Sequence, residues 1–142
     1  MVNKVQVSGA STPKVKKEVI QAAKKLLQYF SLNQTSLDIF FLNDVEMTRI
    51  KKSHLPHKSG PANTLSFSSV EDFPHPDGSK KPLGEIYLNR DLTKGKLEEI
   101  LPLLVHSFLH LLGYHHRRSR DMITMNRLAT KLLSEIKKKS RA

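Results

Sequence analysis

The sequence predicts an α+β fold, in which a four-stranded mixed sheet packs against about four to five helices. Short apolar runs of strand length alternate with longer segments whose apolar residues recur every three or four positions. The last two helical segments follow the strands, and no repeat or linker divides the chain. With 142 residues, 38% of them hydrophobic, the chain can bury a substantial core. We therefore expect a single domain spanning residues 1–142.

The first half of the chain predicts two strands, each followed by a helix. Residues 4–7 alternate between polar and apolar side chains, as a strand does. Thr12 is a suitable N-cap for a helix whose apolar positions recur from residue 15 to residue 30. Residues 36–42 form a strongly apolar run that predicts a buried central strand, and residues 45–53 predict a second helix.

The second half predicts two more strands and two long helices. Residues 62–67 and 85–88 have the composition of strands, and a polar loop rich in proline separates them. Asp91 or Thr93 begins the next helix, which runs near residues 97–112 and is apolar on almost every side. We expect Pro102 to kink this helix or to mark its true first turn, since proline cannot donate the helical hydrogen bond.

The final helix is predicted at about residues 119–137, with one apolar face. The central helix, in contrast, is predicted to be buried because its apolar residues surround it. A buried helix is a rigid support for side chains that must keep a fixed geometry.

A string of histidines is the most informative feature of the sequence. His106 and His110 are four residues apart on the predicted central helix, which places both imidazoles on one face. Gly113 can end the helix and turn the chain, so that His116 reaches the same ion. Three neutral imidazoles leave a fourth tetrahedral position open, which is typical of a catalytic zinc site. The chain has no cysteine, so thiolate ligands are excluded. We expect one Zn²⁺ ion per chain on these three histidines.

The same spacing occurs in metzincin proteases, where a glutamate follows the first histidine and activates the zinc-bound water. Here that position is Ser107, which is not a carboxylate and cannot act as the base at neutral pH. A zinc peptidase is therefore a less favoured alternative.

The histidine segment also resembles the YbeY family of ribosomal-RNA maturation endoribonucleases, whose motif runs H-G-x-L-H-L-x-G-Y-D-H. Seven positions are identical, Ser107 replaces the glycine, and His115 replaces the aspartate. Residues 62–67 resemble the family's T-[DN]-V-L-S-F segment at an edge of the active-site cleft, with Ala62 and Thr64 as departures. The segment Leu83-Gly84-Glu85-Ile86 is similar to the family's L-G-[DE]-I.

The resemblance implies the same α+β fold and a metal-dependent endoribonuclease of single-stranded RNA. It implies processing of the 16S ribosomal RNA 3′ end and a part in ribosome biogenesis. The expected partners are ribosomal RNA and the small ribosomal subunit, with no nucleotide cofactor.

One departure concerns the mechanism. The family carries a Tyr-Arg pair shortly before T-[DN]-V-L-S-F, but Leu55 and Pro56 occupy those positions here. His57 or Lys58 could replace the charge of the arginine, although neither offers its bidentate guanidinium. His115 could be a proton shuttle, a phosphate contact, a substitute ligand or simply an exposed turn residue. His115, His57 and Lys58 are the candidate catalytic residues.

The charge of the chain favours a polyanionic partner. Lys and Arg outnumber Asp and Glu by 24 to 13, which gives a formal net charge of +11. Aromatic residues make up only 6% of the chain, so we expect phosphate contacts rather than base stacking as the main mode of binding. The candidate RNA-binding residues are Arg117, Arg118 and Arg120, directly after the histidines, and Asn63.

The sequence contains no apolar run long enough to cross a membrane and no signal-peptide core near residue 1, so we expect a cytoplasmic protein with no membrane partner. A third functional hypothesis stays open beside the nuclease and the peptidase. It is a non-catalytic ribosome-binding factor in which the metal is structural.

Overall fold

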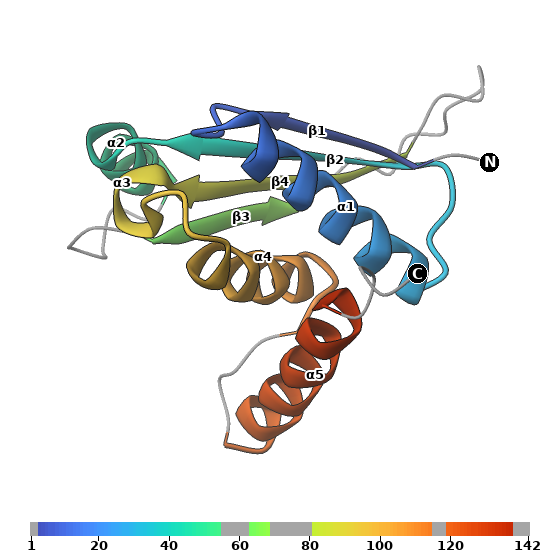
Figure 1. Ribbon diagram of the computed structural model, residues 1–142. Helices are drawn as coiled ribbons and strands as arrows, with labels where there is room; N and C mark the ends of the chain where they lie inside the picture. The colour runs from blue at the N-terminus through green and yellow to red at the C-terminus, as the bar shows by residue number, and fades with distance from the viewer. Residues whose placement is uncertain (1–2, 55–62, 69–80, 115–118, 138–142) are drawn as a thin grey trace.

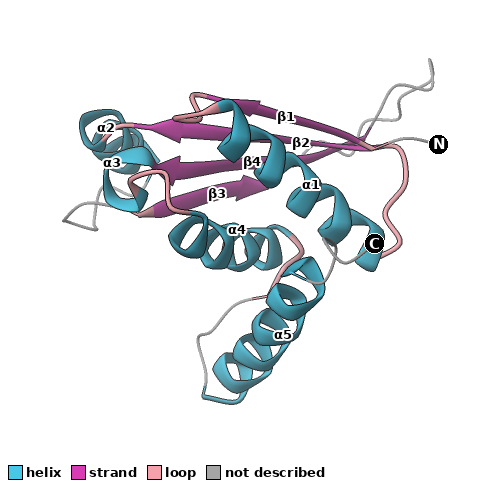
Figure 2. Ribbon diagram, viewed as in Figure 1, coloured by secondary structure: helices cyan, strands magenta, loops and turns pink. Residues whose placement is uncertain are grey.

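The computed structural model describes residues 3–54, 63–68, 81–114 and 119–137. Its elements follow the order β-α-β-α-β-β-α-α-α (Figures 1 and 2). The strands are β1 (Lys4–Ser8), β2 (Thr35–Leu42), β3 (Thr64–Ser68) and β4 (Lys81–Asn89). The helices are α1 (Pro13–Tyr29), α2 (Asp44–His54), α3 (Arg90–Thr93), α4 (Leu97–Leu111) and α5 (Ser119–Lys137). The predicted α+β class with a four-stranded sheet is confirmed.

The sheet has the order β1-β2-β4-β3 and is mixed, as predicted. Strands β1, β2 and β4 are parallel, and β3 pairs with β4 in the antiparallel direction at the edge. The β2 side chains alternate regularly between buried and half-buried, because one face of the sheet meets the core. Because β2 and β4 are parallel, their carboxyl ends lie at one end of the sheet, beside α2 and α3 (Figure 1).

The core lies between the sheet and two helices, α1 and α4, which cover the same face. It combines Ile39 and Ile86 from the sheet with Leu26 of α1 and Phe108 of α4, all with at most 1% exposure. Helix α1 begins where the sequence predicts, because the Thr12 side chain accepts a hydrogen bond from a backbone N–H of the first turn. Helix α5 packs beneath α4 and α1, and its amino-terminal half projects from the body (Figure 1).

The start of the central helix differs from the prediction. The segment after β4 forms the separate short helix α3, which Asn89 caps through its side-chain oxygen. Lys94 and Gly95 then both adopt positive φ, which interrupts the helical path before α4 begins at Leu97. Pro102 lies inside α4, so the expectation that it marks the first turn is wrong. Its side chain is exposed to solvent.

A buried asparagine fixes the loops at the carboxyl end of the sheet. Asn89 is fully buried, and its side-chain amide donates to the Asp44 carboxylate at 2.7 Å. Its backbone N–H donates to the Asn63 carbonyl at 2.9 Å. These bonds join the beginnings of α2, α3 and β3, so the first residues of β3 are held in place beside α4. Among the described residues, no helix combines the length and apolar composition needed to cross a bilayer.

Candidate metal centre

Helix α4 brings the first two histidines of the string together. The Nε2 atoms of His106 and His110 are 3.0 Å apart, and their ring centroids are 4.6 Å apart at an interplanar angle of 75°. Without an ion, this distance fits a hydrogen bond in which one imidazole donates and the other accepts. Both rings are half-buried on the same side of the helix, as the spacing predicts. The two Nε2 atoms can therefore face one ion.

The end of α4 turns the chain immediately after the pair. Gly113 has φ of 101°, and its N–H donates to the His110 carbonyl at 3.0 Å. The N–H of Tyr114 donates to the Leu109 carbonyl at 3.0 Å. These two bonds form a Schellman motif, which requires a left-handed residue at the glycine position. The prediction that Gly113 ends the helix and turns the chain is thereby confirmed, and the chain leaves the helix within four residues of His110.

A groove runs beside the histidine pair, between β3 and α4. Its volume is about 470 Å³. The β3 side of the groove begins at Asn63, and the α4 side carries both histidines. Its lining is completed by Thr64, Leu65, Ser66, Pro102, Leu103 and Ser107. No carboxylate lines the groove among the residues that the structure describes, so these residues supply no general base of the metzincin kind.

Ser107 joins the two walls of the groove. Its hydroxyl is 2.5 Å from the Thr64 hydroxyl, and the Thr64 hydroxyl donates to the Tyr87 carbonyl at 3.1 Å. Thr64 has a single hydroxyl proton, so Ser107 is the donor in the bond between the two side chains. Ser107 is 1% exposed. Its hydroxyl therefore ties α4 to β3 and β4, and it is engaged in that contact rather than facing a substrate.

The chemistry and spacing of the pair fit a zinc ion. In a tetrahedral site with Zn–N bonds of about 2.0–2.1 Å, two ligand nitrogens are separated by about 3.3 Å. The observed 3.0 Å between the Nε2 atoms of His106 and His110 is within a few tenths of an ångström of that value. Among the described residues there is no cluster of three or more potential ligands. The predicted third ligand, His116, lies outside the described residues.

The other predicted site residues are placed only in part. Asn63 lines the groove and is exposed, and Arg120 is exposed in the first turn of α5. The remaining predicted catalytic and RNA-binding residues lie outside the described residues: His57, Lys58, His115, Arg117 and Arg118. The structure therefore brings together His106, His110 and Asn63 around one groove.

The opposite face of the sheet carries an aromatic cluster that the sequence did not reveal. Phe40 stacks on Tyr87 with ring centroids 5.1 Å apart, and Phe67 meets Tyr87 edge to face at 5.8 Å. Burial and, after it, the Glu85 carboxylate, which accepts the phenol hydrogen bond at 2.8 Å, together raise the pKa of Tyr87 to about 12. The strand register places these rings together, since Phe40 pairs with Tyr87 across β2 and β4. The available signal was that Phe40 and Tyr87 each follow a core-facing isoleucine, so strand alternation places both rings on the face away from the core.

A sequence profile described as endoribonuclease YbeY matches residues 2–137. The chain belongs to the YbeY endoribonuclease family. The endoribonuclease YbeY of Coxiella burnetii is 33% identical over 112 residues, which cover 73% of this chain and 71% of that protein. The endoribonuclease YbeY of Aquifex aeolicus is 30% identical over 117 residues, covering 76% and 75% of the two chains.

Solved structures support the fold of this YbeY family member. The solution structure of TM1509 from Thermotoga maritima superposes with a TM-score of 0.61 at 17% sequence identity. The match covers 99% of this chain and 92% of that chain. At this identity the likeness concerns the fold alone.

Two departures from the YbeY motifs meet in space. Ser107 stands where the histidine motif has glycine, and Thr64 stands where the T-[DN]-V-L-S-F segment has valine. The positions are 43 residues apart in the sequence, yet the two new hydroxyls bond to each other. A hydroxyl at either position alone would lack this partner. One hydrogen bond therefore joins the two departures.

Proposed function

We propose that the chain is a zinc-dependent endoribonuclease that acts on ribosomal RNA. One observation carries the proposal: two imidazole nitrogens 3.0 Å apart lie beside an open groove in a chain of the YbeY family. The relatives at about 30% identity bear the name endoribonuclease, which supports RNA as the substrate class. The net charge of +11 is also suited to a polyanionic substrate.

In this proposal His106, His110 and His116 hold the zinc ion. When bound, zinc would supply Lewis-acid stabilisation of a phosphoryl oxygen and would lower the pKa of a water ligand toward neutrality. The neutral imidazoles must be fixed in the tautomer that presents Nε2 to the ion. The buried helix α4 holds the backbone of both described histidines in place, because its neighbours in the core restrict its movement.

The groove would bind the RNA segment that contains the scissile bond. Asn63 can donate or accept hydrogen bonds at the exposed end of the β3 wall. Arg120, with Arg117 and Arg118, would contact phosphates next to the site. His115 remains a candidate proton carrier, and His57 or Lys58 remain candidates for the charge that arginine provides in the family motif.

We place the activity in the maturation of the 16S ribosomal RNA 3′ end on the small ribosomal subunit, in the cytoplasm. This assignment rests on the YbeY resemblance. A zinc peptidase is disfavoured, because Ser107 is engaged with Thr64 and no described groove residue is a carboxylate.

A non-catalytic ribosome-binding factor is the second candidate, and a specific observation favours it. The positions of the family's Tyr-Arg pair hold Leu55 and Pro56, and the aspartate of the histidine motif is His115. If these changes removed the catalytic groups, the metal would be structural and RNA would bind without being cut.

Incubation of the purified protein with single-stranded RNA from the 3′ region of 16S ribosomal RNA tests the proposal. We expect cleavage by the wild type, loss of cleavage with a chelator, and recovery when zinc is added. His110→Ala should be inactive, whereas His54→Ala, a matched histidine change outside the groove lining, should retain activity. Products ending in a 2′,3′-cyclic phosphate would indicate attack by the neighbouring 2′-hydroxyl, and other ends would indicate attack by water. Binding without cleavage would favour the ribosome-binding factor.

A further inference from the structure

Helix α1 carries a cationic face that the candidate metal centre does not use. Lys14, Lys17, Gln21, Lys24 and Gln28 follow one another at intervals of three and four residues, so they share one side of the helix. We call this set the lysine face. The core residues of α1, such as Val19 and Leu26, occupy the opposite side. The three lysines are exposed, and no described residue of α1 lines the groove.

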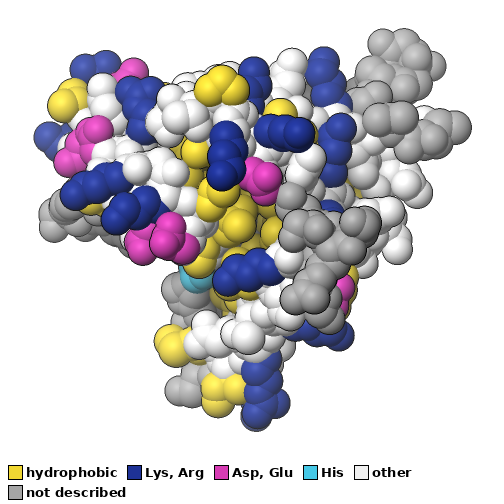
Figure 3. All heavy atoms as spheres, in the orientation of Figure 1, with side chains coloured by type: hydrophobic (Ala, Val, Ile, Leu, Met, Phe, Trp, Pro, Cys, Tyr) yellow, Lys and Arg dark blue, Asp and Glu magenta, His cyan; other side chains and the backbone are white. Residues whose placement is uncertain are grey.

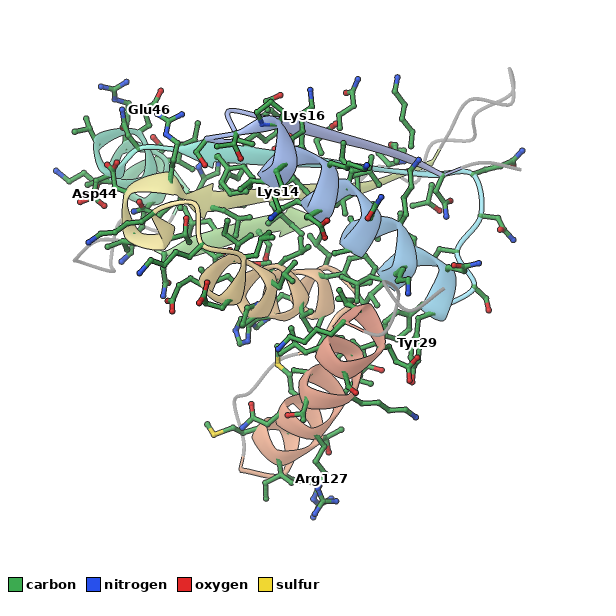
Figure 4. The ribbon with its side chains drawn as sticks, in the orientation of Figure 1. Lys14, Lys16, Tyr29, Asp44, Glu46 and Arg127 are labelled. Atoms are coloured by element: carbon green, nitrogen blue, oxygen red, sulfur yellow. The ribbon has the colours of Figure 1, made fainter. Side chains whose placement is uncertain are left out.

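The arrangement of charge on α1 opposes the stability of the helix. Its first turn contains no acidic residue and its last turn no basic residue, although lysines stand near its positive amino end. Helix α2 follows the opposite and favourable pattern, with Asp44 and Glu46 in the first turn and basic residues in the last. Figure 4 labels these acidic residues on α2 and Lys14 and Lys16 at the beginning of α1. Interaction with the helix dipole therefore does not explain the lysines near the amino end of α1.

Past the carboxyl end of α1, α5 adds both charges, since Glu135 lines a pocket with Gln28 and Tyr29. There Lys131 of α5 lies over the ring of Tyr29, with its Nζ 5.9 Å from the ring centroid. Arg127 projects from α5 further along (Figure 4). On the side of the molecule shown in Figure 3, Lys and Arg side chains gather over α1 and again over α5. Glu18 is the only acidic residue in α1.

We propose that the lysine face binds the phosphate backbone of the RNA substrate outside the groove, an inference that rests on the proposed function. The span from Lys14 to Lys24 is about 15 Å at 1.5 Å per residue. That length corresponds to roughly four steps of a nucleic-acid helix at about 3.4 Å per step. The set contains only lysine and glutamine, whose side chains can donate hydrogen bonds to phosphate oxygens.

An anionic membrane surface fits this face less well. Helices that bind membranes insert an apolar face and surround it with lysines. The apolar face of α1 is buried against the sheet and α4, and the lysine face itself holds no apolar side chain. RNA needs only the exposed cations, so it is the partner that the geometry favours.

The test compares two triple variants of the full chain with equal changes of net charge. The first is Lys14→Gln, Lys17→Gln and Lys24→Gln on the lysine face. The control replaces three exposed cations elsewhere, Lys4→Gln, Arg49→Gln and Lys52→Gln. Binding of a structured fragment of 16S ribosomal RNA is measured as a function of salt, and cleavage of a short oligonucleotide that fills only the groove is measured in parallel.

We expect the lysine-face variant to bind the long RNA about tenfold more weakly at low salt, with a salt slope smaller by about two. Cleavage of the short oligonucleotide should match the wild type, and the control variant should bind normally. Equal weakening in both triple variants would reduce the effect to net charge and overturn the inference. Unchanged RNA binding by the lysine-face variant would also overturn the inference. The same holds if that variant keeps its binding to RNA but loses binding to phosphatidylglycerol vesicles. Failure of the wild type to bind RNA would instead overturn the proposed function and this inference together.

Discussion

The bond between Ser107 and Thr64 makes a quantitative prediction about stability. Thr64→Val keeps the side-chain shape but removes the acceptor of the Ser107 hydroxyl and the donor to the Tyr87 carbonyl. Because Ser107 is 1% exposed, water cannot easily replace the lost partner. We expect Thr64→Val to lower the free energy of unfolding by about 1–2 kcal/mol. The loss is no larger because the Ser107 hydroxyl can instead donate to a backbone carbonyl of the preceding turn of α4.

Ser107→Ala removes the other half of the pair. The lost hydrogen bond costs about 1 kcal/mol, and the higher helix propensity of alanine offsets up to about 0.5 kcal/mol. The double variant should lose about 1 kcal/mol less than the sum of the two single variants, because the second change removes a group that has already lost its partner. Ser134→Ala, at an exposed position of α5, is the matched control and should change stability by less than about 0.5 kcal/mol.

Urea unfolding at a fixed pH measures all four proteins against the wild type. Additive effects, agreeing within about 0.3 kcal/mol, would refute the idea that the two hydroxyls form one interaction. A double variant more stable than the wild type would show that apolar side chains at both positions serve stability better than this polar pair.

Two further predictions concern the end of α4 and the sheet. Gly113→Ala should lower the free energy of unfolding by about 1–2 kcal/mol, because φ of 101° is unfavourable for alanine. It should also weaken zinc binding, because the turn at Gly113 leads toward His116. Thermal unfolding equal to that of the wild type would contradict the role of this turn. The pKa of Tyr87 is raised from 10.0 to about 12, so the folded protein keeps the Tyr87 proton at pH values where the unfolded chain has lost it. The free energy of unfolding should therefore fall as pH rises from 10 to about 12. Below pH 10, Tyr87 should add no pH dependence to the stability. An absorbance titration of tyrosinate should show one of the three tyrosines ionising late, and that late step should disappear in Tyr87→Phe.

The strands and long helices could be predicted because their signals are local. Alternation identified β1, a strongly apolar run identified β2, and the Thr12 cap with its apolar spacing identified α1. The i, i+4 spacing of His106 and His110 likewise predicted that their imidazoles lie side by side, because helix geometry alone places these positions on one face.

Features that depend on distant contacts or unusual backbone geometry were not predicted. Helix α3 separates from α4 because Lys94, a residue without a glycine's freedom, adopts positive φ. Strand β4 begins at Lys81, whereas the sequence predicted a strand over residues 85–88. The additional residues include Pro82, which pairs with Ser36 directly before the register of β2 and β4 shifts at Leu37. The bond between Ser107 and Thr64 required the fold to bring together residues that are far apart in the sequence.

The most direct test of the metal centre is the metal content of the purified protein, measured by elemental analysis. Wild type, His110→Ala and His54→Ala should be prepared identically and shown to be folded. We predict about one zinc ion per chain in the wild type and in His54→Ala, and a loss of zinc in His110→Ala. Absence of zinc from the folded wild type even after incubation with the ion, or retention of zinc by His110→Ala, would contradict the assignment and leave the histidine pair as a packing contact of α4.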